Sequence, residues 1–202
     1  MAGVRHLTGW KKCWKLWPNN YNGSFFLRDN CLILTLIKSI NFRMGKINNT
    51  WKLIIAVVIC VATGFLSGLI GSANNNDWFV KLNKPWWNPP SYLFAPVWTG
   101  LYLLMGISLW QVWKANKDKI IKQSALRYFI IQLLLNFCWS IIFFRFQLPG
   151  WALIDILLLF ILIFITILQF ATISKLAAWL LVPYIAWVSF ACCLNFAIWK
   201  MN

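Results

Sequence analysis

Three stretches of the sequence combine a tryptophan with amide or carboxyl side chains at intervals of three or four residues. The three sets are Gln132, Asn136, Trp139 and Phe143; Trp151, Asp155, Leu158, Leu162, Thr166 and Gln169; and Tyr184, Trp187, Ala191 and Asn195. Residues at this spacing share one side of an α-helix. Indole rings stack on flat molecules and amides hydrogen-bond, so three such faces predict a cavity for a flat ligand. Interhelical hydrogen bonding and core packing are the alternative.

Other kinds of chemistry have little support in the sequence. His6 is the only histidine, and the six cysteines show neither C-x-x-C nor Cys/His metal spacing. We therefore expect no metal site, no Cys-His pair and no Ser-His triad. Asp155 is the only acid inside an apolar stretch, and a lone acid without a His or Glu partner is weak support for a proton relay.

The amino-acid composition is that of a membrane protein. Of the 202 residues, 61% are hydrophobic, 18% aromatic and 11% charged, with a net charge of +15. A soluble domain has roughly 45–50% apolar and about 25% charged residues. Too few polar groups are present to cover a soluble surface, and too many large apolar residues for a disordered basic chain. The charge does not indicate nucleic-acid binding either, because basic loops beside membrane spans explain it.

Five apolar stretches are long enough to cross about 30 Å of hydrocarbon. They cover residues 51–71, 94–114, 125–144, 151–173 and 176–199. Backbone groups in lipid must be paired within the segment, so these stretches should be helices. The predicted fold class is an all-α membrane protein, a bundle of five transmembrane helices occupying residues 44–202. Residues 1–43 form a basic extension, which we expect to be poorly ordered; a targeting segment, a surface-lying arm and a start at Met44 are open alternatives.

The loop between the first two spans, residues 72–93, is unusually long and rich in Asn, Pro and Trp. Pro85, Pro89, Pro90 and Pro96 prevent a regular helix through the first half of residues 84–98. Pro96 is compatible with the first turn of the following helix. A stiff aromatic loop at the mouth of a bundle predicts a lid; a cap that only shields the bundle end is the alternative.

Three further patterns concern the membrane. From residue 44 onward, the side that carries the N-terminus has eight Lys or Arg residues and the opposite side four. In a bacterial membrane this predicts the N-terminus inside, with the long loop and the C-terminus outside. Tryptophans near span ends fit the interfacial belt, whereas others lie deeper; the belt set is Trp51, Trp113, Trp151 and Trp199, and the deeper set is Trp98, Trp139 and Trp187. Gly64 and Gly68 form a close-approach face in the first span.

A series of motifs over residues 51–200 resembles the TspO/MBR family, the translocator and tryptophan-rich sensory proteins once called peripheral benzodiazepine receptors. The motifs are Trp78 with Leu82-x-Lys84-Pro85-x-Trp87-x-Pro89-Pro90; Pro96-Val97-Trp98-x-x-Leu101-Tyr102-x-x-Met105-Gly106; Gln132-x-x-x-Asn136 with Trp139 and Phe143-Phe144; Trp151-Ala152-Leu153-x-Asp155; and Pro183-Tyr184-x-x-Trp187-x-x-Phe190 with Leu194-Asn195.

The resemblance implies a five-helix bundle, often a homodimer, with one pocket beneath the first loop. Family members bind porphyrins, chiefly protoporphyrin IX, so a porphyrin such as protoporphyrin IX or haem is the expected ligand, with no required cofactor. By position, the implied pocket comprises Trp87, Pro89, Phe94, Ala95, Trp98, Asn136, Trp139, Trp151, Leu158, Trp187 and Ala191. Tryptophans matching Trp98 and Trp187 are linked to light-dependent porphyrin degradation in some bacterial members, so these two would be catalytic if that reaction occurs.

The resemblance leaves alternatives open. The expected function is porphyrin binding in tetrapyrrole sensing, transport or disposal; a light-dependent degrading enzyme and a sterol or lipid transporter are the others. Sterol binding has less support, because residues 194–200 carry Phe196 and Trp199 where the animal cholesterol motif needs Tyr. The expected location is the bacterial cell envelope, or the mitochondrial outer membrane or another organelle membrane in a eukaryote.

Overall fold

The computed structural model describes residues 48–72 and 76–202, and within these residues all regular structure is helical. The elements are α3 (Asn49–Ser72), α4 (Asn76–Lys81), α5 (Ser91–Lys114), α6 (Lys119–Ser140), the π-helical turn η2 (Ile141–Arg145), α7 (Pro149–Ala171), α8 (Lys175–Leu180) and α9 (Val182–Met201). The predicted all-α architecture is confirmed. The extension predicted for residues 1–43 lies outside the described residues.

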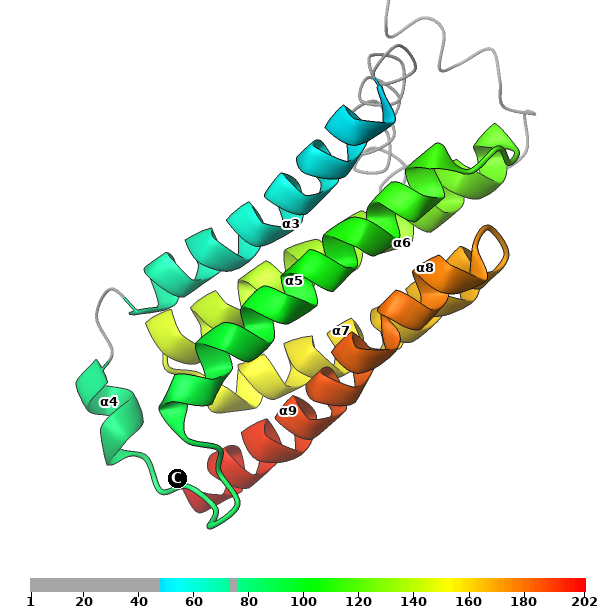
Figure 1. The fold of residues 1–202 in the computed structure, drawn as a ribbon. Coiled ribbons are helices and arrows are strands. Elements are labelled where there is room, and N and C mark those ends of the chain that lie inside the picture. Colours follow the sequence, from blue (N-terminus) through cyan, green and yellow to red (C-terminus); the bar gives the residue numbers. More distant parts are fainter. Residues whose placement is uncertain (1–47, 73–75) are drawn as a thin grey trace, which may run out of the picture. The chain divides into compact units, whose positions relative to one another are not determined.

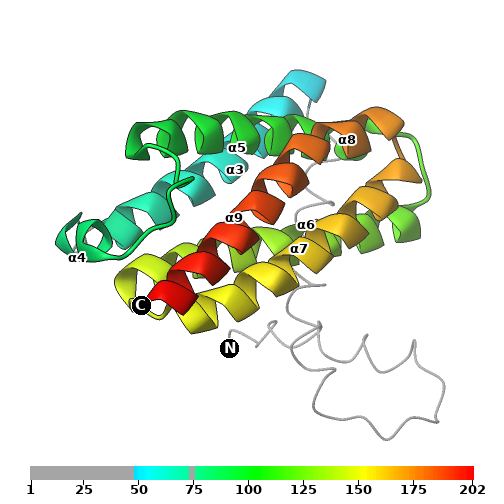
Figure 2. The ribbon, with the colours of Figure 1, turned by 90° about the horizontal axis from the view of Figure 1, so that it is seen from below.

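Five helical segments are long and apolar enough to cross a membrane: Asn49–Gly71, Ser91–Lys114, Lys119–Arg145, Pro149–Ala171 and Lys175–Met201. They match the five predicted spans, with ends shifted by up to six residues. The chain is therefore a multi-pass membrane protein. The segments lie alongside one another, as the ribbon in Figure 1 and the view from below in Figure 2 show. The main packed pairs are α3 with α5, α6 with α7, and α7 with α9.

Glycines set how closely α3 and α5 approach each other. A Cβ atom on Gly64 would collide with the ring of Tyr102, and one on Gly106 would lie 2.6 Å from the Cα atom of Val57. The close-approach face predicted in the first span therefore packs against α5 within the same chain. Gly68, its second member, faces open space within the described structure.

At two prolines the helices differ from the sequence-based expectation. The fifth span is not one continuous helix, because α8 ends at Leu180 and α9 begins at Val182. Pro183 has no N–H with which to continue the α8 hydrogen-bond ladder. In the second span, α5 already begins at Ser91, so Pro96 lies inside the helix rather than in its first turn. The helix tolerates Pro96 at the loss of one backbone hydrogen bond.

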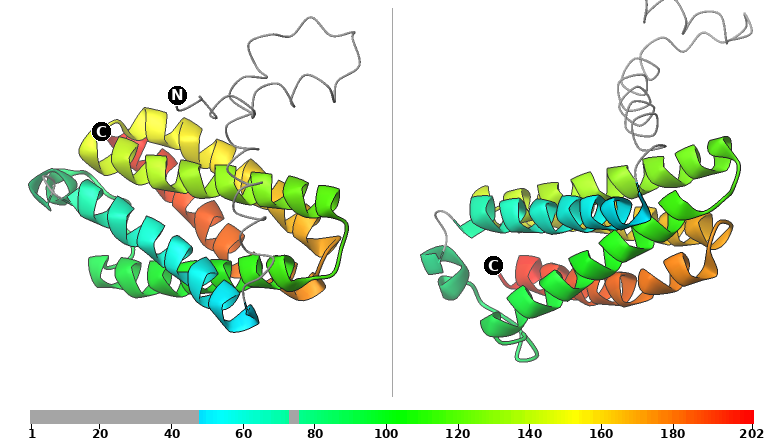
Figure 3. Two further views of the ribbon diagram at one scale, coloured as in Figure 1. Left: turned by 90° about the horizontal axis from the view of Figure 1, so that it is seen from above. Right: turned by 45° about the horizontal axis from the view of Figure 1, so that its top comes forward.

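One end of the bundle is covered by α4 and the irregular segment that follows it; we call residues 76–90 the lid. Figure 3 shows α4 beyond the end of α3, with the lid leading to the start of α5. The C-terminal end of α9 lies at this same end. The backbone N–H of Asn83 donates to the side-chain oxygen of Asn202 at 3.0 Å, and the Asn202 amide donates to the Asn83 carbonyl at 3.0 Å. These bonds tie the lid to α9.

Candidate ligand-binding site

A small cavity of about 30 Å³ lies beneath the lid. Its wall is mostly aromatic and is built by the lid, α5, the end of α6 with η2, and α9. The lining residues are Phe79, Phe94, Trp98, Trp139, Phe143, Phe144, Trp187, Ala191, Leu194, Asn195 and Ile198. A volume of this size holds about one water molecule. The site is thus a tightly filled aromatic cluster that is partly open to its surroundings, and a large ligand can enter it only if side chains move.

Helical spacing places the wall residues. Trp139 and Phe143 are four residues apart, as are Trp187 and Ala191, so each pair projects from one face of its helix. These residues belong to the predicted faces of the third and fifth spans, and both faces reach the cavity. Trp98, one turn beyond Phe94, reaches it from α5. Trp98, Trp139 and Trp187, the three tryptophans predicted to lie deeper than the belt, thus all line the cavity.

Aromatic rings in mutual contact fill most of the space under the lid. Trp139 stacks on Phe143 with ring centroids 5.3 Å apart, and Phe143 meets Phe144 edge-on at 4.9 Å. Phe94 meets Trp187 edge-on at 6.1 Å. Such pairs contribute about 0.5–1.5 kcal/mol each beyond their area burial, through contacts that another aromatic ring can replace. The geometry therefore suits the exchange of side-chain contacts for contacts with a flat aromatic ligand.

Asn195 is the only lining residue with an amide, and its hydrogen bonds are made within the protein. Its Oδ1 accepts from the Trp139 indole N–H at 3.2 Å, and its Nδ2 donates to the Pro149 carbonyl at 2.7 Å. Asn195 thereby fixes the plane of the Trp139 ring and ties α9 to the start of α7. The lining contains no charged side chain, so the cavity itself recognises apolar surface.

A chain of hydrogen bonds among buried side chains lies deeper in the bundle. The Tyr102 hydroxyl donates to Asn136 Oδ1, Asn136 Nδ2 donates to the Tyr184 hydroxyl at 3.0 Å, and that hydroxyl donates to Gln132 Oε1 at 3.0 Å. Trp98 contacts both tyrosine rings, with centroid distances of 5.7 and 6.4 Å. Asn136, predicted as a ligand contact, belongs to this chain and does not line the cavity. For these polar residues the structure therefore shows the alternative named above, hydrogen bonding between helices.

The predicted face of the fourth span is divided. Asp155 and Thr166 are buried, whereas Trp151 is 66% and Leu158 51% exposed. The buried side of α7 instead passes through residues such as Ala152, Ile156, Leu159 and Ile163. Trp151 and Leu158 therefore point away from the cavity, contrary to the sequence-based placement. The reason is that α7 is apolar almost all round, so its pattern does not mark an inward face.

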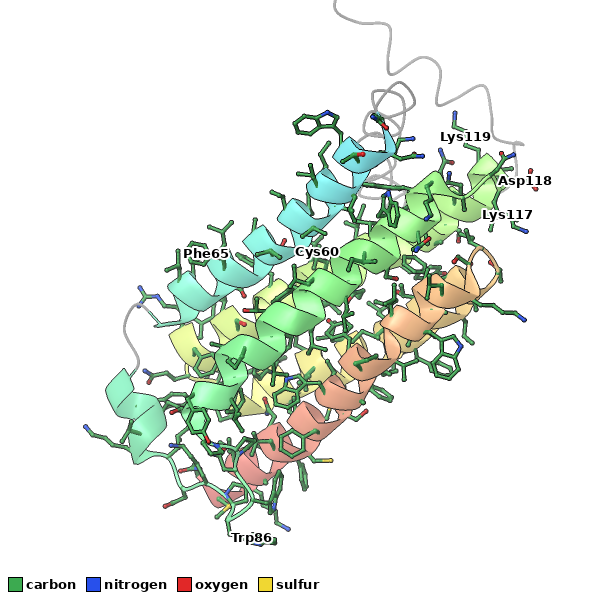
Figure 4. The ribbon with its side chains drawn as sticks, viewed as in Figure 1. Cys60, Phe65, Trp86, Lys117, Asp118 and Lys119 are labelled. Carbon is green, nitrogen blue, oxygen red and sulfur yellow. The ribbon has the colours of Figure 1, made fainter. Side chains whose placement is uncertain are left out.

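Of the residues in and next to the lid that were predicted for the pocket, only some line the cavity. Trp87 packs edge-on against Phe190 at 5.6 Å and does not line the cavity. Pro89 is half-buried and Ala95 is exposed, and neither lines the cavity. Phe94 does line it. Trp86, the second tryptophan of the lid motif, is 95% exposed and points away from the bundle in Figure 4.

Several wall residues were not among the predicted contacts: Phe79, Phe143, Phe144, Leu194, Asn195 and Ile198. Phe143 and Asn195 lie on the predicted helical faces, so the spacing alone could have added them. Phe79 comes from α4, a short helix that no apolar periodicity in the sequence predicted. Its ring meets Phe143 and Phe144 edge-on at 6.3 and 5.6 Å.

Within residues 48–72 and 76–202, no three His, Cys, Asp or Glu side chains are grouped to hold a metal ion.

The comparisons with known proteins all point to the same family. The family model described as TspO/MBR family matches residues 56–200. The tryptophan-rich protein TspO of Chlorobaculum tepidum is 44% identical over 154 residues, covering 74% of this chain and 95% of that protein. The translocator protein of Sus scrofa is 36% identical, with 69% and 83% covered. The tryptophan-rich sensory protein of Cereibacter sphaeroides is 29% identical, with 77% and 94% covered.

Proposed function

The chain belongs to the TspO/MBR family, and on that premise we propose that it is a membrane binding protein for flat tetrapyrroles of the protoporphyrin class. The observation that carries the proposal is the aromatic cavity, where Trp98, Trp139 and Trp187 from three different helices meet beneath the lid. Indole rings offer large flat surfaces to a macrocycle. Binding would serve the sensing, transport or disposal of the pigment.

Ligand entry follows from the small volume of the cavity. A macrocycle does not fit into about 30 Å³, so wall residues must give way. Phe79 belongs to the six-residue helix α4 of the lid and Phe94 to the first turn of α5, whereas Trp139 lies where α6 continues into η2 and Trp187 lies within α9. We infer that the lid and the Phe94 ring move outward, and that the ligand takes their place against the two indoles. Burial of the macrocycle then drives binding, at roughly 25 cal/mol per Å² of apolar surface.

Titration of the purified full chain with protoporphyrin IX, followed by tryptophan fluorescence, tests the proposal. Saturable quenching is expected, with affinity reduced roughly fivefold to tenfold in Trp187→Phe, which loses stacking area. Trp86→Phe is the matched control, because it makes the same change at an exposed lid position. Quenching that never saturates, or equal affinities for the two variants and the wild type, would contradict the proposal.

Light-dependent breakdown of the bound porphyrin is the second candidate. It is favoured by the position of Trp98 and Trp187, since both indoles line the cavity and would touch a bound macrocycle. The relatives' names, tryptophan-rich, translocator and sensory, describe no enzyme. Illumination of the complex in air separates the candidates. A porphyrin absorption spectrum that decays faster with wild type than with Trp98→Phe supports degradation, and a stable spectrum leaves binding alone.

A further inference from the structure

Lys84 is a lid cation in contact with the wall of the cavity. Its Nζ lies 4.2 Å from the centroid of the Phe79 ring, and Phe79 lines the cavity. Lys84 is half-buried, whereas Lys81, the other lysine of the lid, is exposed. The ammonium group of Lys84 therefore stands at the rim of the aromatic cluster, one ring away from the space that a ligand would enter.

Among the described side chains, no acid compensates the charge of Lys84. Within the described part of the chain Lys84 makes neither a hydrogen bond nor an ion pair, and its ammonium group lies over the Phe79 ring. A cation over a ring keeps its capacity for a charge-assisted hydrogen bond to an anion, which is the stronger interaction. A half-buried ammonium that lies over an aromatic ring beside the cavity wall is thus available to an anion that comes with the ligand.

The cavity interior, by contrast, has no group that could compensate a charge on the ligand. Its lining has no charged side chain, and the single amide, Asn195, is already bonded to Trp139 and Pro149. An ionised group placed among these rings would lose its hydration without compensation. Any carboxylate on a ligand must therefore stay at the rim while the flat body is buried. The lid rim, where Lys84 lies, is one place where the structure offers such a group a cation.

We propose that Lys84 is the anion anchor of the site: its ammonium group binds a carboxylate on one edge of a flat aromatic ligand whose body packs against Trp139 and Trp187. The ligand class is thereby narrowed to planar macrocycles with acidic substituents on an edge, as the propionates of protoporphyrin are. This inference rests on the proposed function. It assigns Lys84 to recognition of charge, and the indoles to recognition of shape.

The test compares protoporphyrin IX with its dimethyl ester, which has the same macrocycle but carries two uncharged methyl esters in place of the two carboxylates, on the full chain in detergent at neutral pH. Lys84→Met keeps an unbranched apolar stem on Phe79 and removes the charge. We expect this variant to lose roughly tenfold in affinity for the diacid, the size of one charge-assisted hydrogen bond. Affinity for the ester should stay within about twofold. Lys84→Arg, which keeps the charge, should retain most of the preference for the diacid.

Lys81→Met is the matched control, because it removes one lid charge from an exposed position; it should leave the preference intact. Equal loss for diacid and ester in Lys84→Met would assign Lys84 to lid packing and overturn the inference. Unchanged diacid affinity in that variant would overturn it too, while the proposed function would stand. Failure of both probes to bind the wild type would overturn the proposed function and the anchor together.

Discussion

The helix α6 and its continuation η2 present one face to two different surroundings. At Gln132 and Asn136 that face meets tyrosine hydroxyls, through directional hydrogen bonds. At Trp139 and Phe143 it meets other rings, in contacts that tolerate a range of angles. A buried polar group that loses its partner is destabilised by its full desolvation, whereas a ring can exchange one aromatic neighbour for another. The deeper region thus fixes the helices, and the lid region is the part that can admit a ligand.

Trp98 connects the two regions. Its ring contacts Tyr102 and Tyr184, which belong to the hydrogen-bonded chain, and the residue also lines the cavity. Phe79, another lining residue, is instead carried by the six-residue helix α4. On the proposed function, we therefore expect the lid to adapt to a ligand and Trp98 to stay in place.

The largest expected effect comes from breaking the deeper region. Asn136→Ala removes two buried hydrogen bonds and leaves both tyrosine hydroxyls without their Asn136 partner. We expect the free energy of unfolding in detergent to fall by about 2 kcal/mol, above the average for membrane helix contacts because the site is fully buried. Denaturant titration followed by circular dichroism measures it. Asn116→Ala, at an exposed loop position, should change little; an equal loss there would remove the contrast between the regions.

A smaller effect is expected where the lid is tied down. Asn202→Ala removes both exposed hydrogen bonds between the Asn202 side chain and the backbone of Asn83. Exposed bonds of this kind contribute about 0.5 kcal/mol each, so the loss of two should let the lid open about five times as often. Stopped-flow quenching by porphyrin should show association and dissociation both accelerated about fivefold, with the dissociation constant nearly unchanged. Unaltered rates would mean that this end of the lid does not control entry.

The smallest effect is expected at Trp151. The family resemblance implies that it contacts ligand, but the structure exposes it on the outer side of α7. Trp151→Phe should therefore leave porphyrin affinity within about twofold of wild type, whereas Trp187→Phe lowers it. Parallel fluorescence titrations of the two variants decide the matter. An equal loss in both would show that a ligand or a second chain reaches the outer face of α7.

The sequence was most informative where polar residues interrupt apolar helices. Gln132 and Asn136 in α6, and Tyr184 and Asn195 in α9, must avoid lipid, and the structure buries all four. In α7 there is little such contrast, and apolar spacing alone did not distinguish the side of Ile156 from that of Leu158. The predicted placement failed at the helix where the lipid-facing and inward-facing sides have the same chemistry.

By itself the sequence determined the membrane location, the number of spans, the family and two of the three predicted inward faces. Those properties follow from the length and periodicity of apolar segments, which act locally along the chain. Only the tertiary structure decided that Asn136 bonds to tyrosines while Trp139 faces the cavity, that Phe79 returns from α4 to close the wall, and that Lys84 stands over it. These features depend on which segments meet in space, and local spacing carries no information about that.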